Sequence, residues 1–371
     1  MKKTVIAMAA LIIVSCTEEP ENDTTEENLD TLVITHEVMI GDENIYSDYG
    51  FAIVSDICLG PDGSVFVVDP MRAEARRFSS SGELMVSYGQ KGEGPGEFTE
   101  PLGIALTHSG LLFVSDARGL NTFNAESAEW LGLNGSYTRP MLLKMIGNRD
   151  STFTALRSWS FIAGQVPVRT AQYGLYNAGN PLPVVFWSDS SRIDHSEGSF
   201  IRTCSEEPVA TVDAQGNVYI SESTDSRVRI LKYSPEGELL TLIEDDFPPV
   251  MLSEEQRSRE EEYYTSFANR LGMSITYTPQ DSWLAVTSLG IDRNSLIWAR
   301  VGGAEPPLFR VYDQTGNLIA YVRVDGVPVN GRYLDIRISP WGMAGFTFDP
   351  SAELVQVLLY EIPEISAASS N

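Results

Sequence analysis

Four short apolar segments of the chain each end in a charged residue. The segments VFVVD, LFVSD, VYISE and IWAR end in Asp69, Asp116, Glu222 and Arg300. If these segments are equivalent strands of a repeat, their last side chains gather on one face, and Asp56 lies close to them on a neighbouring strand. Hard cations such as calcium require several oxygen ligands. The sequence therefore suggests a cation or polar-ligand site, with these five residues as candidates.

The segment GQKGEGPGEFTEP (residues 89–101) combines glycines, a lysine and acidic residues, as a phosphate-binding loop might. A phosphate loop needs its glycines to open a helix, so that backbone N–H groups face the anion. Here a proline and a strand pattern follow, and Glu93, Glu97 and Glu100 would repel phosphate. We predict a connecting loop between two repeated units, with Phe98 inserted between them.

Two further kinds of catalytic site have no signature in the sequence. The three histidines are His36, His108 and His195, and no two of them have the spacing of zinc ligands. There is no GxSxG segment, and no Ser/His/Asp arrangement is detectable.

Aromatic residues reveal the repeat that would position the charged side chains. A strand that ends in Phe or Tyr recurs at intervals of 45, 53, 57, 79 and 48 residues. These aromatic residues are Phe78, Phe123, Tyr176, Tyr233, Tyr312 and Tyr360. Each interval holds about four short strands, which is typical of a β-propeller blade. The sequence predicts an all-β, six-bladed β-propeller over residues 32–362 and a C-terminal tail over 363–371.

The run TLVITHEVMI (residues 31–40) precedes the first unit and belongs to none. The sixth unit lacks an outer strand, because only eleven residues follow Tyr360. We expect the N-terminal strand to complete the last blade, which closes the ring and removes exposed edges.

Two cysteines fall on inner strands of this predicted ring. Cys58 lies in the first blade and Cys204 enters the fourth, which is opposite. A disulfide requires Cα atoms within about 7 Å of each other. We therefore expect two free thiols.

The longest interval contains an insertion between blades four and five, LSEEQRSREEEYYTSFANRLG (residues 252–272). Ser253 and Gln256 have the spacing of a capping box, and Gly272 stands where a C-cap belongs, so the segment is predicted to be a helix. It would lie over the face with the charged residues, as a lid or partner-binding element, or pack on the flank for stability. The lid or partner-contact candidates are Tyr263, Tyr264 and Phe267.

The segments DGSVFVVD (62–69), GEGPGEFTEPLGIAL (92–106) and GLLFVSD (110–116) resemble the NHL-repeat class of six-bladed propellers, and especially its secreted bacterial lipoproteins. The resemblance covers the whole predicted ring and is sharpest in blades one, two and four. It implies that Asp69 and Asp116 cap backbone N–H groups of the next turn, which is the alternative to a cation site. Gluconolactonase-type relatives hold a cation in the channel, so calcium is a candidate cofactor, although their ligand motif is not recognisable here.

The N-terminus has the pattern of an export signal. Lys2 and Lys3 precede eleven mostly apolar residues, fewer than the roughly 20 that span a bilayer as a helix. The sequence Ile-Val-Ser-Cys that follows resembles the bacterial lipobox, which implies a signal peptide over residues 1–15 and a lipid on Cys16. Residues 16–31 are acidic and poor in apolar side chains, so we expect a disordered tether. The expected location is extracytoplasmic, anchored to the cell envelope at the outer membrane.

The net charge of the chain disfavours two kinds of partner. Residues 16–371 carry 51 acidic and 24 basic side chains, a net charge of −27, which disfavours nucleic acid and anionic lipid surfaces. The favoured function is a monomeric, non-catalytic binding module for a protein, peptide or glycan, attached to the membrane through its lipid. The alternative is a cation-dependent hydrolase or lactonase with its site at the channel mouth.

Overall fold

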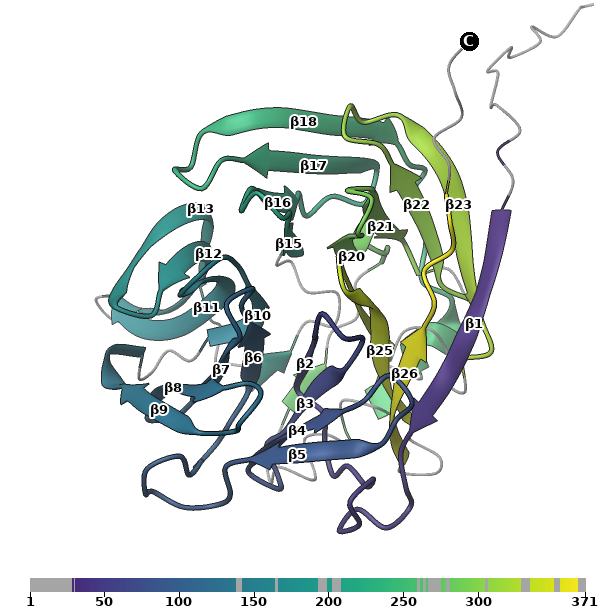
Figure 1. The fold of residues 1–371 in the computed structure, drawn as a ribbon. Helices are drawn as coiled ribbons and strands as arrows, with labels where there is room; N and C mark the ends of the chain where they lie inside the picture. The colour runs from purple at the N-terminus through teal and green to yellow at the C-terminus, as the bar shows by residue number, and fades with distance from the viewer. Residues whose placement is uncertain are drawn as a thin grey trace, which may run out of the picture.

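Nearly all of the structure is β-sheet arranged around a central axis. The structure is a computed structural model that describes residues 29, 31–137, 142–163, 166–192, 199–201, 208–258, 261–262, 265, 275–277, 281–303, 306–327, 334–349 and 354–365. Within these residues the sheets stand side by side around a channel, as the blades of a propeller do (Figure 1). The predicted all-β propeller architecture is confirmed.

Four sheets contain four strands each, paired in chain order. The first has β2 (Asp56–Leu59), β3 (Val65–Asp69), β4 (Glu74–Phe78) and β5 (Leu84–Tyr88). The second has β6 (Gly103–Leu106), β7 (Leu111–Asp116), β8 (Gly119–Asn124) and β9 (Trp130–Asn134), followed by a short 3-10 helix, η1 (Gly135–Tyr137). The third has β10 (Leu142–Gly147), β11 (Thr152–Ala163), β12 (Val166–Asn177) and β13 (Asn180–Arg192). The fourth has β15 (Ala210–Val212), β16 (Val218–Ser221), β17 (Arg227–Tyr233) and β18 (Leu239–Asp246).

The remaining strands form an eight-stranded sheet and a separate pair. The eight-stranded order is β20-β21-β22-β23-β1-β26-β25-β24. Its strands are β20 (Val286–Ile291), β21 (Ile297–Val301), β22 (Leu308–Tyr312), β23 (Leu318–Asp325), β1 (Thr31–Ile40), β26 (Leu354–Tyr360), β25 (Gly342–Asp349) and β24 (Asp335–Ser339). The separate pair is β14 (Ser199–Ile201) with β19 (Ile275–Tyr277), which run parallel.

The N-terminal strand joins the two halves of the eight-stranded sheet. Residues 31–35 of β1 run parallel to β23, and His36 to Ile40 run antiparallel to β26. Residues from opposite ends of the chain are thereby hydrogen-bonded, and β26 has a partner on its outer side. The predicted pairing of residues 31–40 with the last strand is present.

Burial along the strands follows their distance from the axis. All residues of β3 and β6 are buried, whereas β9 alternates between half-buried and exposed residues. A strand covered by neighbouring sheets on both faces must be continuously apolar, and a rim strand covers only one. Exposed leucines such as Leu131 and Leu240 lie on rim strands. The repeated apolar runs of the sequence are therefore the second strands of their sheets, β3, β7, β16 and β21, which lie between the innermost strand and the outer two.

Three glycines at equivalent turns explain the recurring sequence after each aromatic residue. Gly82, Gly237 and Gly316 each turn the third strand of a sheet into the fourth, with φ of 85°, 92° and 92°. Only glycine adopts this left-handed conformation without a steric cost. The motif is therefore a backbone requirement of the turn.

The glycine-rich loop between β5 and β6 is structural. Phe98 is fully buried, and its ring lies 5.8 Å from that of Phe123 in the core between the first two sheets. A Glu97 carboxylate oxygen accepts the Gly94 N–H at 2.8 Å, and Arg118 donates to the Glu97 carbonyl at 2.6 Å. Hydrogen bonds within the loop thus fix its shape, and the predicted insertion of Phe98 between two units is confirmed.

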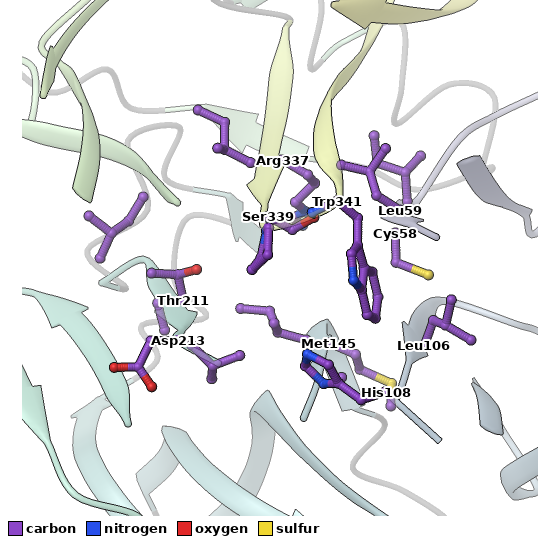
Figure 2. A pocket seen from close by; sticks show the side chains of 18 residues that line it. Cys58, Leu59, Leu106, His108, Met145, Thr211, Asp213, Arg337, Ser339 and Trp341 are labelled. Atoms are coloured by element: carbon purple, nitrogen blue, oxygen red, sulfur yellow. The ribbon is translucent and has the colours of Figure 1, made fainter. Parts of the chain in front are cut away.

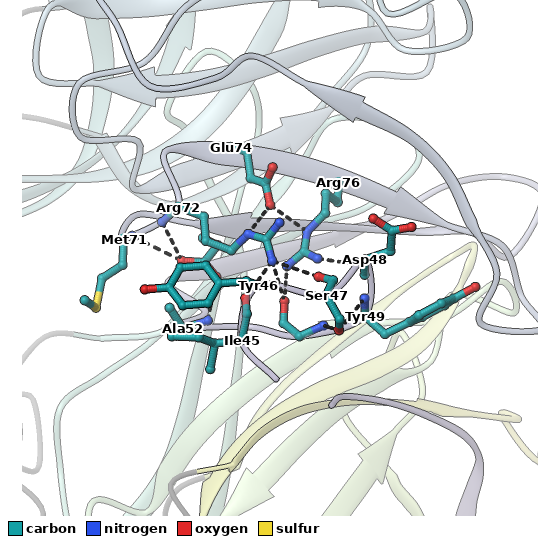
Figure 3. A network of polar contacts seen from close by, with 12 residues as sticks. Ile45, Tyr46, Ser47, Asp48, Tyr49, Ala52, Met71, Arg72, Glu74 and Arg76 are labelled. Carbon is teal, nitrogen blue, oxygen red and sulfur yellow. Dashed lines mark hydrogen bonds and ion pairs between the residues drawn. The ribbon is translucent and has the colours of Figure 1, made fainter. Parts of the chain in front are cut away.

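Two arginines, Arg72 in the turn before β4 and Arg76 within β4, hold the link from β1 to β2 (Figure 3). Arg72 donates through Nη1 to the carbonyls of Ile45 and Ser47 at 2.6 and 2.8 Å. Arg76 donates to the Asp48 and Gly50 carbonyls, both at 2.7 Å. A guanidinium offers five donors in a rigid fork, so two such side chains can satisfy a loop that has few backbone partners. This anchor positions β2, which enters the channel.

No helix in the described part of the chain is long and apolar enough to cross a membrane.

The burial pattern of β1 predicts that two substitutions on this strand lower the free energy of unfolding by different amounts. Ile40 is buried against the first and last sheets, whereas Val33 is 51% exposed. We expect Ile40→Ala to lower the free energy of unfolding by about 2–5 kcal/mol. Val33→Ala should change it by no more than about 0.5 kcal/mol. Denaturant unfolding of both variants measures this, and equal losses would contradict the packing of this strand.

Candidate functional site

In the described part of the chain, the channel is where every sheet except the β14–β19 pair contributes side chains to one space. The innermost strands β2, β6, β10, β15, β20 and β24 surround it. Contacts join β2 to β6, β6 to β10, β15 to β20 and β20 to β24, and β24 returns to β2. Short strands whose side chains alternate in direction send every second residue toward the axis. The site is therefore built from single residues contributed by segments far apart in the sequence.

A cavity of about 70 Å³ opens at the end of the channel where the innermost strands turn into the second strands (Figure 2). Its wall is mainly apolar. The wall includes Leu59, Leu106, Met145, Ile338 and Trp341. Thr211 and Asp213 lie on the side opposite Cys58 and Leu106 (Figure 2).

An aromatic pair stands at the mouth of this cavity. Trp341 follows β24, and its ring centroid lies 5.0 Å from that of exposed His108 at an interplanar angle of 58°. The His108 ring Nδ1 lies 3.3 Å from the Asn148 carbonyl oxygen, and its backbone N–H donates to the same oxygen. Trp341 is half-buried. Two flat side chains thus border the opening, and His108 is held by the neighbouring sheet.

Asp56 closes the middle of the channel. Its side chain is 1% exposed and accepts the Ile57 N–H at 3.0 Å, the Ile104 N–H at 3.1 Å and the Met145 N–H at 3.2 Å. Arg337 Nη2 donates to the same carboxylate at 3.0 Å. One carboxylate therefore joins β2, β6, β10 and β24.

The pKa values of this pair reflect burial and charge. Burial raises the pKa of Asp56, while the Arg337 guanidinium and the Ile104 N–H act in the opposite direction. Burial alone would lower the pKa of Arg337, but the carboxylates of Asp335 and Asp56 outweigh it and hold that pKa above its ordinary value. Removing either partner would leave an uncompensated charge in the channel.

A second cavity, of about 40 Å³, lies on the other side of this pair, toward the ends where the innermost strands begin. Its lining is more polar. It includes Lys144, Tyr173, Ser288, Asp335 and Arg337. Arg337 borders both cavities. The ion pair thus divides the channel into an apolar end and a cationic end.

The two predicted aspartates at the ends of second strands act as backbone caps. Asp69 accepts the Ala52 N–H at 2.7 Å and the N–H groups of Met71 and Arg72, both at 3.1 Å. Asp116 is fully buried and accepts the Thr99 and Glu100 N–H groups at 2.9 and 2.7 Å. The contacts of Asp69 with Met71 and Arg72 cap the following turn, which is the form that the NHL resemblance implies, whereas Ala52, Thr99 and Glu100 lie in the loops before β2 and β6. Together these contacts occupy the oxygens that a cation would need.

Glu222 and Arg300 have other partners. Glu222 pairs with Arg229 at 2.6 Å near the rim. Arg300 is 6% exposed and donates to the Leu334 carbonyl of the neighbouring innermost strand at 2.6 Å. The structure gives each of the five predicted residues its own partners, and only Asp56 reaches the centre of the channel.

Part of the predicted insertion is described. Residues 254–258 are helical, and Ser253 and Gln256 exchange the two hydrogen bonds of a capping box, at 2.9 and 3.2 Å. Several predicted residues lie outside the described residues. They are Cys16, His195, Cys204, Tyr263, Tyr264 and Phe267.

Cys58 is a free cysteine that borders the apolar cavity. Burial raises the pKa of its thiol well above the ordinary value, and the Asp56 carboxylate adds to this shift. The thiol therefore stays protonated near neutral pH and acts as a small apolar group.

The residues present do not fit a calcium ion. Among the described residues, no three His, Cys, Asp or Glu side chains gather closely enough to hold a metal. The one carboxylate at the channel centre, that of Asp56, already accepts three N–H groups and a guanidinium. A cation there would have to displace Arg337, which carries the same sign of charge.

One feature of the sequence could have identified Arg337 as a residue of the channel. The strands DICL (56–59) and DIRI (335–338) share their first two residues, and Arg337 occupies the position of Cys58. A charge in an otherwise apolar innermost strand requires a partner. Trp341 and Lys144 carried no such signal, because neither lies in a recognisable motif.

Comparison with known proteins gives distant structural likenesses alone. No family model and no curated protein matches the chain. The calcium-binding regucalcin of Agrobacterium tumefaciens is 11% identical over 91% of this chain and 99% of its own, with a TM-score of 0.47. A gluconolactonase of Xanthomonas campestris is 12% identical over 81% and 82%, with a TM-score of 0.41. A putative exported protein of Bacteroides fragilis is 11% identical over 90% and 100%, with a TM-score of 0.45. Identities and scores this low transfer neither an activity nor a ligand.

The ion pair predicts a pH-dependent cost for Arg337→Met. At neutral pH the variant leaves Asp56 charged and buried, so we expect a loss of about 3–5 kcal/mol in the free energy of unfolding. Without Arg337, burial places the folded-state pKa of Asp56 above its unfolded value. The folded state then binds more protons, so the stability of the variant rises as pH falls from 7 toward 5.

The matched control is Arg323→Met, because Arg323 pairs with Asp325 at the exposed rim. This control should behave as the parent protein does at both pH values. Urea unfolding at pH 7 and pH 5 measures the differences. A deficit for Arg337→Met that stays constant or grows in acid would show that Asp56 is not the group left unpaired.

The carboxylates of Asp56, Asp69 and Asp116 already accept hydrogen bonds, so we expect calcium not to change the thermal stability of the protein. We expect the same melting temperature with calcium in excess and with EDTA, because a ligand stabilises a fold only through a site that it occupies. Differential scanning calorimetry measures this. A saturable rise in melting temperature with calcium would overturn the assignment.

Proposed function

We propose that the protein is a lipid-anchored, extracytoplasmic binding module, which holds an apolar side chain of a basic peptide or protein segment in the cavity beside Trp341. The observation that carries the proposal is the apolar wall of this cavity and the aromatic pair at its open mouth. Binding pockets combine such walls with a few polar groups that orient the ligand. Here Thr211 and His108 are polar groups within the lining.

The charge of the chain favours a basic partner. Residues 16–371 carry a net charge of −27, which attracts cationic segments and steers their approach. An aromatic mouth adds a second attraction, because a Lys or Arg side chain can lie over the face of a tryptophan. A glycan would require more hydrogen-bonding groups in the wall than this cavity provides. The proposal is therefore a peptide segment with one apolar side chain flanked by basic residues.

We infer that the ring has six blades, as in the NHL-repeat proteins that the sequence resembles. The support is the change of partner within β1, which pairs with β23 up to Thr35 and with β26 from His36. The eight-stranded sheet then divides into two four-stranded blades, with β20 and β24 as their innermost strands. Each blade contributes one strand to the channel, so the binding cavity belongs to all of them.

The alternative interpretation, a cation-dependent hydrolase or lactonase, would use the carboxylates of the channel face. Asp69 and Asp116 are engaged as caps, and Asp56 is engaged by Arg337. No observation in the described residues favours this alternative, so a single function is proposed.

Titration of three peptides tests the binding proposal. The first peptide has one phenylalanine with two lysines on each side. The second replaces phenylalanine by serine, and the third replaces the lysines by glutamates. We expect the first alone to bind, because both the apolar side chain and the positive charge are needed.

Trp341→Ala should weaken binding by about tenfold or more, as removal of a central aromatic contact does. Because Trp341 is half-buried, exposed His108→Ala provides a second variant that does not depend on core packing. Met71→Ala is the matched control, since Met71 is 55% exposed in the turn between β3 and β4, at the other end of the channel. Isothermal titration calorimetry gives the affinities, and equal binding of the phenylalanine and serine peptides would refute the proposal.

A further inference from the structure

We propose that the outer edge of β18 is a docking site for an extended strand of a basic peptide or protein segment, which would join the fourth sheet as a fifth strand. β18 (Leu239–Asp246) pairs with β17 and has no other neighbour in the described sheets. It is the outermost strand of its sheet, on the side away from the channel (Figure 1). This edge is separate from the cavity beside Trp341, so the proposal stands whether or not the proposed function is correct.

The first support is the lack of protection along this edge. An edge strand presents backbone N–H and C=O groups to solvent, and natural proteins usually protect such edges with prolines, bulges or short strands. Three of the outermost strands of the four-stranded sheets are protected in this way. β5 and β9 have five residues each, and β13 contains Pro181 and Pro183, which have no N–H to donate. Of the four strands, only β18 is eight residues long without proline or glycine.

A bulge at the same place in β5, β9 and β18 shows how much of each edge is regular. The register with the third strand skips Met85, Leu131 and Leu240, and each of these residues is 49% exposed. A bulge disrupts pairing locally. Beyond it, β5 and β9 continue for three residues each, whereas β18 continues for six, residues 241–246. Of these three strands, β18 therefore has the edge that is long enough for several ladder hydrogen bonds.

The side chains along this edge change from apolar to acidic. Leu242 is 41% exposed, Ile243 is buried, and Glu244 and Asp246 are exposed. Side chains alternate in direction along a strand, so Leu242, Glu244 and Asp246 share one face. A strand that pairs with this edge would meet one apolar side chain and then two carboxylates on that face.

Charge favours a basic occupant. Residues 227–246, the hairpin of β17 and β18, carry five acidic and three basic side chains. The basic side chains already have carboxylate partners, in the pairs Arg227–Glu244, Arg229–Glu222 and Lys232–Asp213. Asp246 Oδ1 lies 4.0 Å from Arg227 Nε, and the Asp246 side chain is 99% exposed. Exposed ion pairs are weak, so lysines of an added strand can share Glu244 and approach Asp246.

A second copy of the chain does not fit this edge. Pairing of two β18 strands would bring six carboxylates together, three from each copy. Like charges on paired strands destabilise a sheet, and the net charge of −25 on each chain adds to the repulsion. The occupant is therefore a strand that is apolar opposite Leu242 and basic opposite the acidic end. Backbone hydrogen bonds would supply affinity, and these side chains would supply specificity.

The peptide Lys-Thr-Lys-Thr-Val-Thr, with acetylated and amidated ends, is the probe. Antiparallel pairing with residues 241–246 sets its valine opposite Leu242 and its lysines opposite Glu244 and Asp246. We expect saturable binding in an NMR titration of the ¹⁵N-labelled protein, with shifts at the amides of β18. Replacement of both lysines by glutamates should abolish the binding. No saturable binding of the lysine peptide would overturn the proposal.

N-methylation of the peptide tests whether the backbone pairs. Alternate backbone groups of a strand point to opposite edges. Methyl groups on every second nitrogen therefore block one edge of the peptide and leave the other free. Of the two peptides methylated in this way, one should bind and the other should not. Equal affinity of the two would contradict strand addition.

Leu242→Lys should weaken binding of the probe by about fivefold or more, because it removes an apolar contact and adds a like charge near the lysines. The matched control is Leu133→Lys, since Leu133 also lies two residues beyond a bulge, in β9, and is 39% exposed. Both sites are exposed, so neither change should unfold the protein. The control should bind as the parent protein does, and equal losses in both variants would refute the assignment to β18.

Two further measurements separate this site from the alternatives. Sedimentation velocity should show a monomer, and a dimer that Leu242→Lys dissociates would replace the peptide by a second copy. Trp341→Ala should leave binding of this probe unchanged. Failure of the phenylalanine peptide at the cavity with success of this probe would therefore reject the proposed function and keep the docking edge.

Discussion

The structure depends on one buried carboxylate. Asp56 accepts hydrogen bonds from the first, second and third sheets and pairs with Arg337 of the neighbouring strand β24. Transfer of a charged carboxylate from water into a protein interior is costly unless partners replace its hydration. The four donors can surround Asp56 only when β2, β6, β10 and β24 stand at their observed positions. The cost of burying this charge therefore favours one arrangement of the strands around the axis over looser ones.

The same pair separates two chemical environments within one channel. Toward the turns, Met145, Trp341 and Ile338 border a cavity that is mainly apolar. Toward the other end, Lys144 and Arg337 border a cavity with ionic groups. Because Asp56 holds the guanidinium at the boundary, Arg337 contributes to both without moving. The channel thus has two cavities with different linings, and the ion pair lies between them.

Features that are encoded in short segments could be predicted from the sequence. Contacts between residues far apart in the chain could not. The turn glycines, the burial of Phe98 and the pairing of residues 31–40 with the last strand followed from local patterns and from the need to cover strand edges. The capping contacts of Asp69 lie within one blade, as the NHL resemblance implied. Asp56 was a candidate, but its partner Arg337 is 281 residues away, and no local pattern links them. The register shift of β10 between Leu143 and Ile146, where Lys144 lies, likewise has no recognisable signal in the local sequence.

The acidic surface and the cationic cavity are compatible because they act over different distances. Exposed charges are screened within about 8 Å at physiological ionic strength, so the net charge of the chain acts mainly on partners that approach from solution. Inside the channel, low polarity and fixed geometry make contacts with Lys144 and Arg337 stronger than the surface field. The net negative charge therefore acts on the approach of partners from solution, while the charges inside the channel act on one another. The effect of charge in this protein therefore depends on where the charge lies, on the surface or in the channel. The Asp56–Arg337 pair is the buried ion pair that fixes the charges inside the channel.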